Sequence, residues 1–239
     1  MASRLGVFLL LTLYGLRIAP DLSPRLIVWN VGQGLWATVI SEDSCWHFDM
    51  GGEKMDWSQV INLCRRRRNH LSLSHWDMDH ISFVSRARNA LPQLCKWNTP
   101  LGPTRDSKRK MLSRVPDCEG VPPFAFWEDA DGKTTNALSR VVQWQGVVMP
   151  GDSSRREEKD WLLRLPGLLR SRVLILGHHG SHTSTSRALL EQMPRLRMAI
   201  ASARLQRYGH PHKRVVQDLE DFKIPLLRTE EWGNILIEL

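Results

Sequence analysis

The sequence predicts an α/β fold built in layers. Segments with the apolar-polar alternation or β-branched content of strands recur along the chain and are separated by stretches with the caps and length of helices. The 239 residues suffice for one large α/β domain or two small ones. Histidines and aspartates cluster directly after several predicted strands, where layered α/β folds carry their ligand sites. These observations predict an α/β domain with a functional site at its strand ends.

The composition is that of a globular protein with a preference for polyanions. Hydrophobic residues make up 42% of the chain and charged residues 24%. The net charge of +8 favours nucleic acid or an acidic membrane surface as a partner, the alternative being a charge that serves only solubility. The four cysteines form no C-x-x-C pair, which argues against a structural zinc site and leaves disulfides undecided.

Residues 1–24 are predicted to be a signal peptide or a membrane anchor, followed by a linker. Arg4 precedes an apolar run over residues 5–16, which as a helix would span about 18 Å, less than the ~30 Å hydrocarbon core of a bilayer. This length fits the apolar region of a secretory signal, although the cleavage pattern is poor. A plain helix packed on the domain is the alternative. Pro20 and Pro24 indicate a linker, so we expect the main domain to span residues 25–239.

The first half of this domain begins with three predicted strands, at residues 26–31, 35–40 and 45–49, with a glycine turn between the first two. Asp56 is typical of the N-cap of a helix that we expect to reach about Arg68. Four arginines at residues 65–68 suggest a nucleic-acid patch. They precede the strand at 71–74, however, whereas the potential metal ligands follow it, so the arginines are expected at the far end of the sheet. The favoured role for them is to complement the negative C-terminus of the preceding helix. A further helix is expected from His80 to about Ala90.

Residues 96–132 have little periodicity and are predicted to form a long basic loop or lid, with one strand near 124–127. The remaining elements alternate between strands and helices. Strands are expected at 138–144, 147–149, 173–176, 198–201, 224–227 and 234–237, helices at 153–165, 184–193 and 213–222, and a loop at 206–212.

The most informative stretch is residues 71–80, where a short strand runs into four potential metal ligands, His75, Asp77, Asp79 and His80. So many ionisable groups at the end of a buried strand would repel one another or stay unpaired without a positive charge among them. A divalent metal ion is the simplest such charge. The alternative is a polar loop with helix-capping aspartates and surface histidines. Similar polar positions follow other predicted strands, namely Asp49, Asp152, His178, His179, His210 and His212.

From residue 26 to residue 239 the chain resembles the metallo-β-lactamase fold and, within it, the nuclease-like domain of the ComEC competence proteins. Two positions depart from the usual pattern, Asn30 before the first glycine motif and Ile81-Ser82-Phe83 after the Asp-His pair. The resemblance is carried by Val31-Gly32-Gln33-Gly34, Asp49-x-Gly51, Ser74-His75-x-Asp77-x-Asp79-His80, Thr135-Asn136-x-x-Ser139, Gly151-Asp152, His178-His179-Gly180-Ser181, Tyr208-Gly209-His210-Pro211 and Arg228-Thr229 with Gly233.

The resemblance implies an αββα sandwich, preceded by the short N-terminal apolar helix, with two divalent metal ions between its sheets. His75 and Asp77 would hold one ion, Asp79 and His80 the other, and Asp152 would bridge them, with His178 or His179 as a further ligand. Asp79 and His210 are the expected catalytic residues, His210 facing the substrate. Asp49 is expected to orient a ligand. Ser181, Thr183 and Ser184 would bind phosphate or, as the favoured alternative, cap the following helix.

The chemistry expected of such a site is phosphodiester hydrolysis by a hydroxide shared between two metal ions about 3.5–4 Å apart. Three aspartates among the ligands favour Mn²⁺ or Mg²⁺, with Zn²⁺ possible. We therefore expect a metal-dependent nuclease that acts on single- or double-stranded DNA, linked to a membrane DNA-uptake channel, without a nucleotide cofactor. Its expected location is the periplasm or the outer face of the cytoplasmic membrane. The alternatives are a hydrolase of a small phosphodiester or ester, and a non-catalytic DNA-binding module of an uptake complex.

Overall fold

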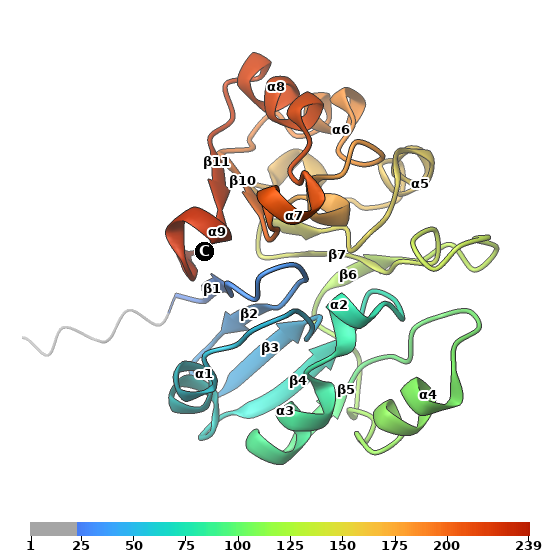
Figure 1. Ribbon diagram of the computed structural model, residues 1–239, viewed down its shortest axis with the longest axis vertical. Helices are drawn as coiled ribbons and strands as arrows, with labels where there is room; N and C mark the ends of the chain where they lie inside the picture. The colour runs from blue at the N-terminus through green and yellow to red at the C-terminus, as the bar shows by residue number, and fades with distance from the viewer. Residues whose placement is uncertain (1–22) are drawn as a thin grey trace, which may run out of the picture.

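The computed structural model describes residues 23–239, which form two stacked six-stranded sheets with helices on their outer faces (Figure 1). This arrangement confirms the predicted αββα sandwich. The predicted signal peptide or anchor lies outside the described residues, except for the end of its linker. No helix within residues 23–239 is long and apolar enough to cross a membrane.

The first sheet has the strand order β12-β1-β2-β3-β4-β5. Strands β1, β2 and β3 form an antiparallel meander, whereas β3, β4 and β5 run parallel to one another. Parallel strands require crossover connections, and helices α1 and α3 provide them. The elements of this half are β1 (Arg25–Val28), β2 (Ala37–Ile40), β3 (Ser44–Phe48), α1 (Trp57–Cys64), β4 (Arg68–Ser72), α2 (Met78–Ile81), α3 (Val84–Ala90), β5 (Leu94–Lys96), α4 (Asp106–Leu112) and β12 (Ile235–Glu238).

The second sheet has the strand order β11-β10-β9-β8-β7-β6, and its strands β8 to β11 are parallel. Helix α5 begins with a capping box, in which the Ser154 side chain accepts a hydrogen bond from a backbone N–H of the first turn and the Glu157 side chain accepts one from the backbone N–H of Ser154. The elements of this half are β6 (Ala125–Trp127), β7 (Val141–Trp144), β8 (Val147–Met149), α5 (Arg155–Trp161), β9 (Val173–Ile175), α6 (Arg187–Glu191), β10 (Met198–Ala201), α7 (Leu205–Tyr208), α8 (Lys213–Asp221), β11 (Leu226–Arg228) and α9 (Thr229–Trp232).

Three apolar clusters hold the layers together. One lies between the two sheets and contains Leu26 and Val39 from the first sheet with Val147 and Ile175 from the second. The other two lie under the helices on the outer face of each sheet. The central strands are buried on both faces and reach solvent mainly at their ends, whereas the edge strands β12 and β6 also expose Leu236 and Phe126. The ends of the strands are therefore where a binding site can form.

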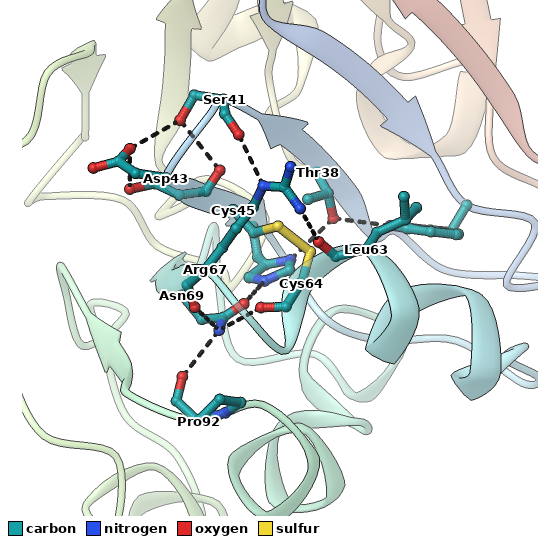
Figure 2. Close-up of a disulfide and its surroundings, with 12 residues drawn as sticks. Thr38, Ser41, Asp43, Cys45, Leu63, Cys64, Arg67, Asn69 and Pro92 are labelled. Atoms are coloured by element: carbon teal, nitrogen blue, oxygen red, sulfur yellow. Dashed lines mark hydrogen bonds between the residues drawn. A yellow bond between two sulfur atoms is a disulfide. The ribbon is translucent and has the colours of Figure 1, made fainter.

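Two disulfides, which the sequence had left undecided, brace the first half of the chain. Cys45–Cys64 joins β3 to the end of α1 (Figure 2), and Cys95–Cys118 joins β5 to a later loop. His70 lies beside the second disulfide, 3.5 Å from Cys95 Sγ, but both sulfurs are bonded to each other and do not form a thiolate metal site. Disulfides persist mainly in oxidising compartments such as the periplasm.

The structure differs from the predicted elements mainly in short helices and boundaries. The predicted loop at 96–132 contains α4, and α7 and α9 occupy stretches without a predicted helix. The helix predicted to reach Arg68 ends at Cys64, because Arg68 already pairs with Ser44 at the start of β4. The arginine run lies at the sheet end away from the histidines, and Figure 2 shows Arg67 reaching the carbonyl of Leu63 in the last turn of α1.

Candidate metal centre

Three strand ends deliver the predicted ligands to one place between the sheets. After β4 the chain enters α2, whose N-cap is Asp77, so that Asp79 and His80 lie on its first turn. Asp152 follows β8, and His178 and His179 occupy the short 3₁₀ turn Gly177–Gly180 after β9. In Figure 1, α2 lies where the two halves of the molecule meet. Because β8 and β9 are parallel, their ends fall at the same edge of the second sheet and face α2.

Asp152 lies at the centre of the cluster. Its Oδ1 is 3.1 Å from Nε2 of His80, and its Oδ2 is 3.7 Å from Nε2 of His75 and 3.6 Å from Nε2 of His178. The Asp152 carboxylate is buried and thus almost wholly removed from water. A buried carboxylate that approaches three imidazoles from two other strand ends could be shared between two cations.

A second group adjoins the first through His80. Nε2 of His179 is 3.1 Å from Oδ2 of Asp79 and 3.3 Å from Nε2 of His80. On the other side, Nε2 of His75 is 3.5 Å from Oδ2 of Asp77. Two sets of side chains are therefore compact enough to hold a divalent cation each, namely His75 with His80 and Asp152, and Asp79 with His80 and His179.

The unsatisfied atoms of the cluster fit metal ions. Nε2 of His75 is buried and has no hydrogen-bond partner among the described residues, and the buried Oδ1 of Asp152 has only the ion-pair contact with Nε2 of His80. Such atoms cost free energy unless a ligand, water or ion pairs with them. Imidazole nitrogens and carboxylate oxygens are suitable ligands for Mn²⁺ and Zn²⁺. The residues present therefore fit the predicted metal ions.

Polar partners on the far side of each imidazole fix which nitrogen faces the cluster. Nδ1 of His80 donates to Oδ2 of Asp49 at 2.7 Å, and Nδ1 of His179 donates to the carbonyl of Ser202 at 3.0 Å. The Ser74 hydroxyl donates to Asp49 and accepts from Nδ1 of His75 at 2.9 Å. Each Nε2 is consequently turned inward, the usual arrangement of metal-bound histidines. Ser74 and Ser202 had no predicted role, since a carbonyl contact across 23 residues has no sequence signature.

Replacing Asp49 with asparagine is expected to weaken metal binding about 10- to 100-fold, because the amide no longer fixes the tautomer or the orientation of His80. Isothermal titration with Mn²⁺ or Zn²⁺ measures the change. Asp43→Asn is a matched control, since Asp43 pairs with Arg68 at the surface away from the cluster. Equal metal affinity of Asp49→Asn and the wild-type chain would contradict the orienting role.

The charges of the cluster reinforce one another in the metal-free chain. Burial by itself lowers the pKa of His80, but the carboxylates of Asp152 and Asp49 outweigh it and raise that pKa well above its ordinary value. Burial by itself raises the pKa of Asp152, but His80 and His179 lower it by more, so that this pKa ends well below its ordinary range. The carboxylate of Asp152 is thus ionised at the centre of the cluster, where positively charged groups around it are favourable.

His178 and His179 both approach Asp152, with Nε2 to carboxylate oxygen distances of 3.6 and 3.8 Å, but they differ in burial and in their other contacts. His179 is buried inside the cluster, whereas His178 is half-buried and its Nδ1 lies 3.3 Å from Oγ1 of Thr183. Ser181 contacts Thr183 at 3.1 Å, so both predicted phosphate-binding residues lie beside His178. The expected capping role is wrong for them, because Ser186 caps α6.

A cleft of about 550 Å³ opens onto the cluster and is lined by Asp79, His178, His179 and His210. The ring of His210 lies 5.9 Å from that of His178, and its buried Nδ1 has no hydrogen-bond partner within residues 23–239. Burial, together with the charges of His179 and His178, lowers the pKa of His210 to about 4, so this imidazole is neutral at pH 7. His212, by contrast, caps α8 and does not line the cleft.

The predicted lid contributes a cation beside the cluster. Nζ of Lys108, on α4, donates to the carbonyl of Trp76 at 2.5 Å, within the segment that carries His75 and Asp77. Thr135 donates to Oδ2 of Asp77 at 3.4 Å from the other side. Asp77 therefore lies between a lysine and a hydroxyl, both from segments for which the sequence predicted no regular structure.

Solved structures with the same arrangement of sheets identify the fold. The metallo-β-lactamase fold protein YhfI from Bacillus subtilis matches 91% of this chain and 100% of its own, with a TM-score of 0.59 at 13% identity. The chain has the metallo-β-lactamase fold. A diphosphatase from the PhnP family matches 90% of this chain and 98% of its own (TM-score 0.55, 10% identity). The CmlA β-hydroxylase (E377D mutant) matches 90% of this chain and 54% of its own (TM-score 0.56, 11% identity). Proteins with this fold usually bind divalent metals and include hydrolases.

Sequence comparison finds competence proteins. The competence protein ComA of Neisseria gonorrhoeae is 26% identical over 90% of this chain and 32% of its own length. The ComE operon protein 3 of Bacillus subtilis is 33% identical over 45% of this chain and 14% of its own length. Recombination protein 2 of Haemophilus influenzae is 25% identical over 87% of this chain and 28% of its own length. This metallo-β-lactamase fold chain thus spans a third or less of these relatives, and the predicted resemblance is confirmed. No family model matches it.

Proposed function

We propose that the chain is a two-metal phosphodiesterase that cleaves DNA and takes part in DNA uptake. The observation that carries this proposal is the convergence on Asp152 of ligand-type side chains from two other strand ends. The similarity to competence proteins and to a recombination protein supports DNA as the substrate. The net charge of +8 favours a polyanion.

In this proposal the ligands are divided between the two ions according to the distances between the side chains. His75, Asp77 and Asp152 hold one ion, and Asp79, His80, His179 and Asp152 hold the other. When bound, the ions supply Lewis acidity at the scissile phosphate and activation of water. Asp79 faces the open cleft and is the ligand nearest to the substrate. The carboxylates among the ligands favour Mn²⁺, with Mg²⁺ or Zn²⁺ as the other candidates.

Side chains around the cleft would hold the phosphate. His210, a neutral imidazole at pH 7, lines the same cleft and could hydrogen-bond a phosphate or a leaving oxygen there. Ser181 and Thr183 are hydroxyl donors beside His178. Lys108 adds positive charge near Asp77 from α4. These groups neutralise and orient the substrate.

The two disulfides bear on where the protein works. Disulfides form and persist outside the reducing cytoplasm, so they support the periplasm or the outer face of the cytoplasmic membrane. A membrane DNA-uptake channel is the partner that the competence relatives suggest. A signal peptide or anchor within residues 1–24 would direct the chain there.

Incubation of the metal-stripped chain with labelled single-stranded and duplex DNA tests the proposal. We expect no cleavage without metal and cleavage on addition of Mn²⁺, Mg²⁺ or Zn²⁺, with Mn²⁺ the most effective. A small chromogenic phosphodiester is assayed in parallel. Hydrolysis of the small substrate without DNA cleavage would favour a small-molecule hydrolase instead. Metal binding without hydrolysis of either substrate would leave a DNA-binding module as the function.

A further inference from the structure

A basic cleft, separate from the one at the metal cluster, lies at the other end of the strands of the second sheet. Its volume is about 930 Å³ and it is lined by Arg170, Arg172, Arg195 and Arg197, which we call the arginine cleft. Arg172 directly precedes β9 and Arg197 directly precedes β10. Because β8, β9 and β10 are parallel, these residues stand at the sheet edge opposite to Asp152 and His179, which follow the strands. Five extended residues from Arg172 to Gly177 span about 17 Å.

The arginine cleft is supported by regular structure. The backbone N–H of Arg172 donates to the carbonyl of Gly146 at 2.7 Å, and that of Arg197 donates to the carbonyl of Arg172 at 2.8 Å. On the opposite wall, the side-chain amide of Gln143 lies so close to Gly167 that a Cβ there would meet it at 2.3 Å. Three chain segments are thus fixed relative to one another, and the four arginines extend from a rigid frame.

The positive charge of this cleft is uncompensated. None of its four guanidinium groups forms an ion pair or a hydrogen bond with any of the residues 23–239, and no carboxylate among them lines the cleft. Glu238 and Leu239 line a smaller adjoining hollow together with Arg172 and Arg197, but neither of their carboxylates forms an ion pair with these arginines. Arg140, Arg187 and Arg214, by contrast, each have an acidic partner. Like charges that share a hollow repel one another, so the cleft is suited to a ligand with several negative charges.

We propose that the arginine cleft binds the phosphate backbone of a DNA strand at a point remote from the metal cluster. Guanidinium forks suit phosphate oxygens, and the amides of Gln143 and Gln145 add uncharged donors in the same hollow. A concave, polar lining fits a strand better than the flat surface of a membrane. The proposal rests on the proposed function for its choice of DNA, and it assigns this cleft to substrate capture and the metal cluster to cleavage.

The test is DNA binding by the full chain in which all four arginines are replaced, R170Q/R172Q/R195Q/R197Q. Fluorescence anisotropy with a labelled 30-nucleotide strand, in EDTA so that the strand stays intact, gives Kd across a series of NaCl concentrations. We expect Kd to rise about 10- to 100-fold at 100 mM NaCl, and the slope of log K against log salt to fall by about 3, because about 0.7 of a counterion is released per phosphate contact. The four side chains are exposed, so the thermal midpoint should not change.

A control with the same loss of charge, R65Q/R66Q/R88Q/K223Q, removes exposed cations from other parts of the surface. An equal loss of DNA affinity in this control would overturn the proposal, as would an unchanged Kd and salt slope in the cleft variant. Loss of binding to vesicles of anionic phospholipid with DNA binding intact would assign the cleft to a membrane instead. Hydrolysis of the small phosphodiester should stay within about twofold of wild type. Because DNA binding is measured without metal, this experiment tests the arginine cleft even if the chain proves to have no nuclease activity.

Discussion

Replacing Asp152 with alanine is expected to lower kcat/KM for a phosphodiester by about 10³-fold or more. Asp152 is the only residue of the cluster whose two carboxylate oxygens face histidines of both metal groups, as far as residues 23–239 show. Its removal would leave His75 and His80 without the charge that joins the two ions. The measurement is initial rate against substrate concentration at saturating Mn²⁺, together with the number of ions bound per chain.

Asp160→Ala is the matched control for Asp152→Ala, because Asp160 is exposed on α5 and lies outside the cluster. It should retain wild-type kcat/KM and metal content. Wild-type cleavage by Asp152→Ala would rule out the two-metal mechanism. A lower rate with both ions still bound would mean that Asp152 positions the substrate and is not needed to bind the metal ions.

Replacing Gly51 with alanine is expected to destabilise the fold by about 3 kcal/mol or more, although the change adds a single methyl group. A Cβ at Gly51 would lie 2.3 Å from the carbonyl carbon of Asp79 and 2.4 Å from the backbone nitrogen of His80. These are backbone atoms, and they are held in place because Met50 donates to the carbonyl of His80 and Leu35 to that of Asp79. The loop after β3 would have to move away from α2, carrying Asp49 with it. Urea unfolding and metal titration measure the two consequences.

Gly120→Ala provides the comparison for Gly51→Ala. Gly120 has a positive φ of 88° in an exposed turn, and no described atom lies within 4 Å of its added Cβ. Its cost should be about 1 kcal/mol, from backbone conformation alone. The thermal midpoint of Gly51→Ala should fall by roughly 6–12 °C, and metal affinity with it. A Gly51→Ala chain as stable as Gly120→Ala would mean that the loop after β3 adapts without displacing α2.

The predicted strands reflect strong local signals. The prediction of a strand at residues 173–176 agrees with β9, whose three apolar residues are all buried. The strand predicted at 71–74 is displaced, since β4 runs from Arg68 to Ser72 and Leu71 is its single apolar residue. The short helices α4, α7 and α9 were missed, since helices of four to seven residues contain too few turns to show a period. The end of α1 was misplaced, because pairing with β3 decided where β4 begins.

For the site, the sequence alone determined the residue types and their place after strands, namely His75, Asp77, Asp79 and His80 after one strand and Asp152 after another. It could not determine how the two histidines of the 178–179 pair are placed. The carbonyl of Ser202, at the end of the neighbouring strand β10, holds His179 beside Asp79 and His80, whereas His178 lies beside Thr183 with its Nε2 3.6 Å from Asp152. The arginine cleft, likewise, exists only because parallel strands place Arg172 and Arg197 at one edge. Sequence patterns report local burial and chemistry, whereas distances between residues far apart in the chain are set by how the sheets pair and pack.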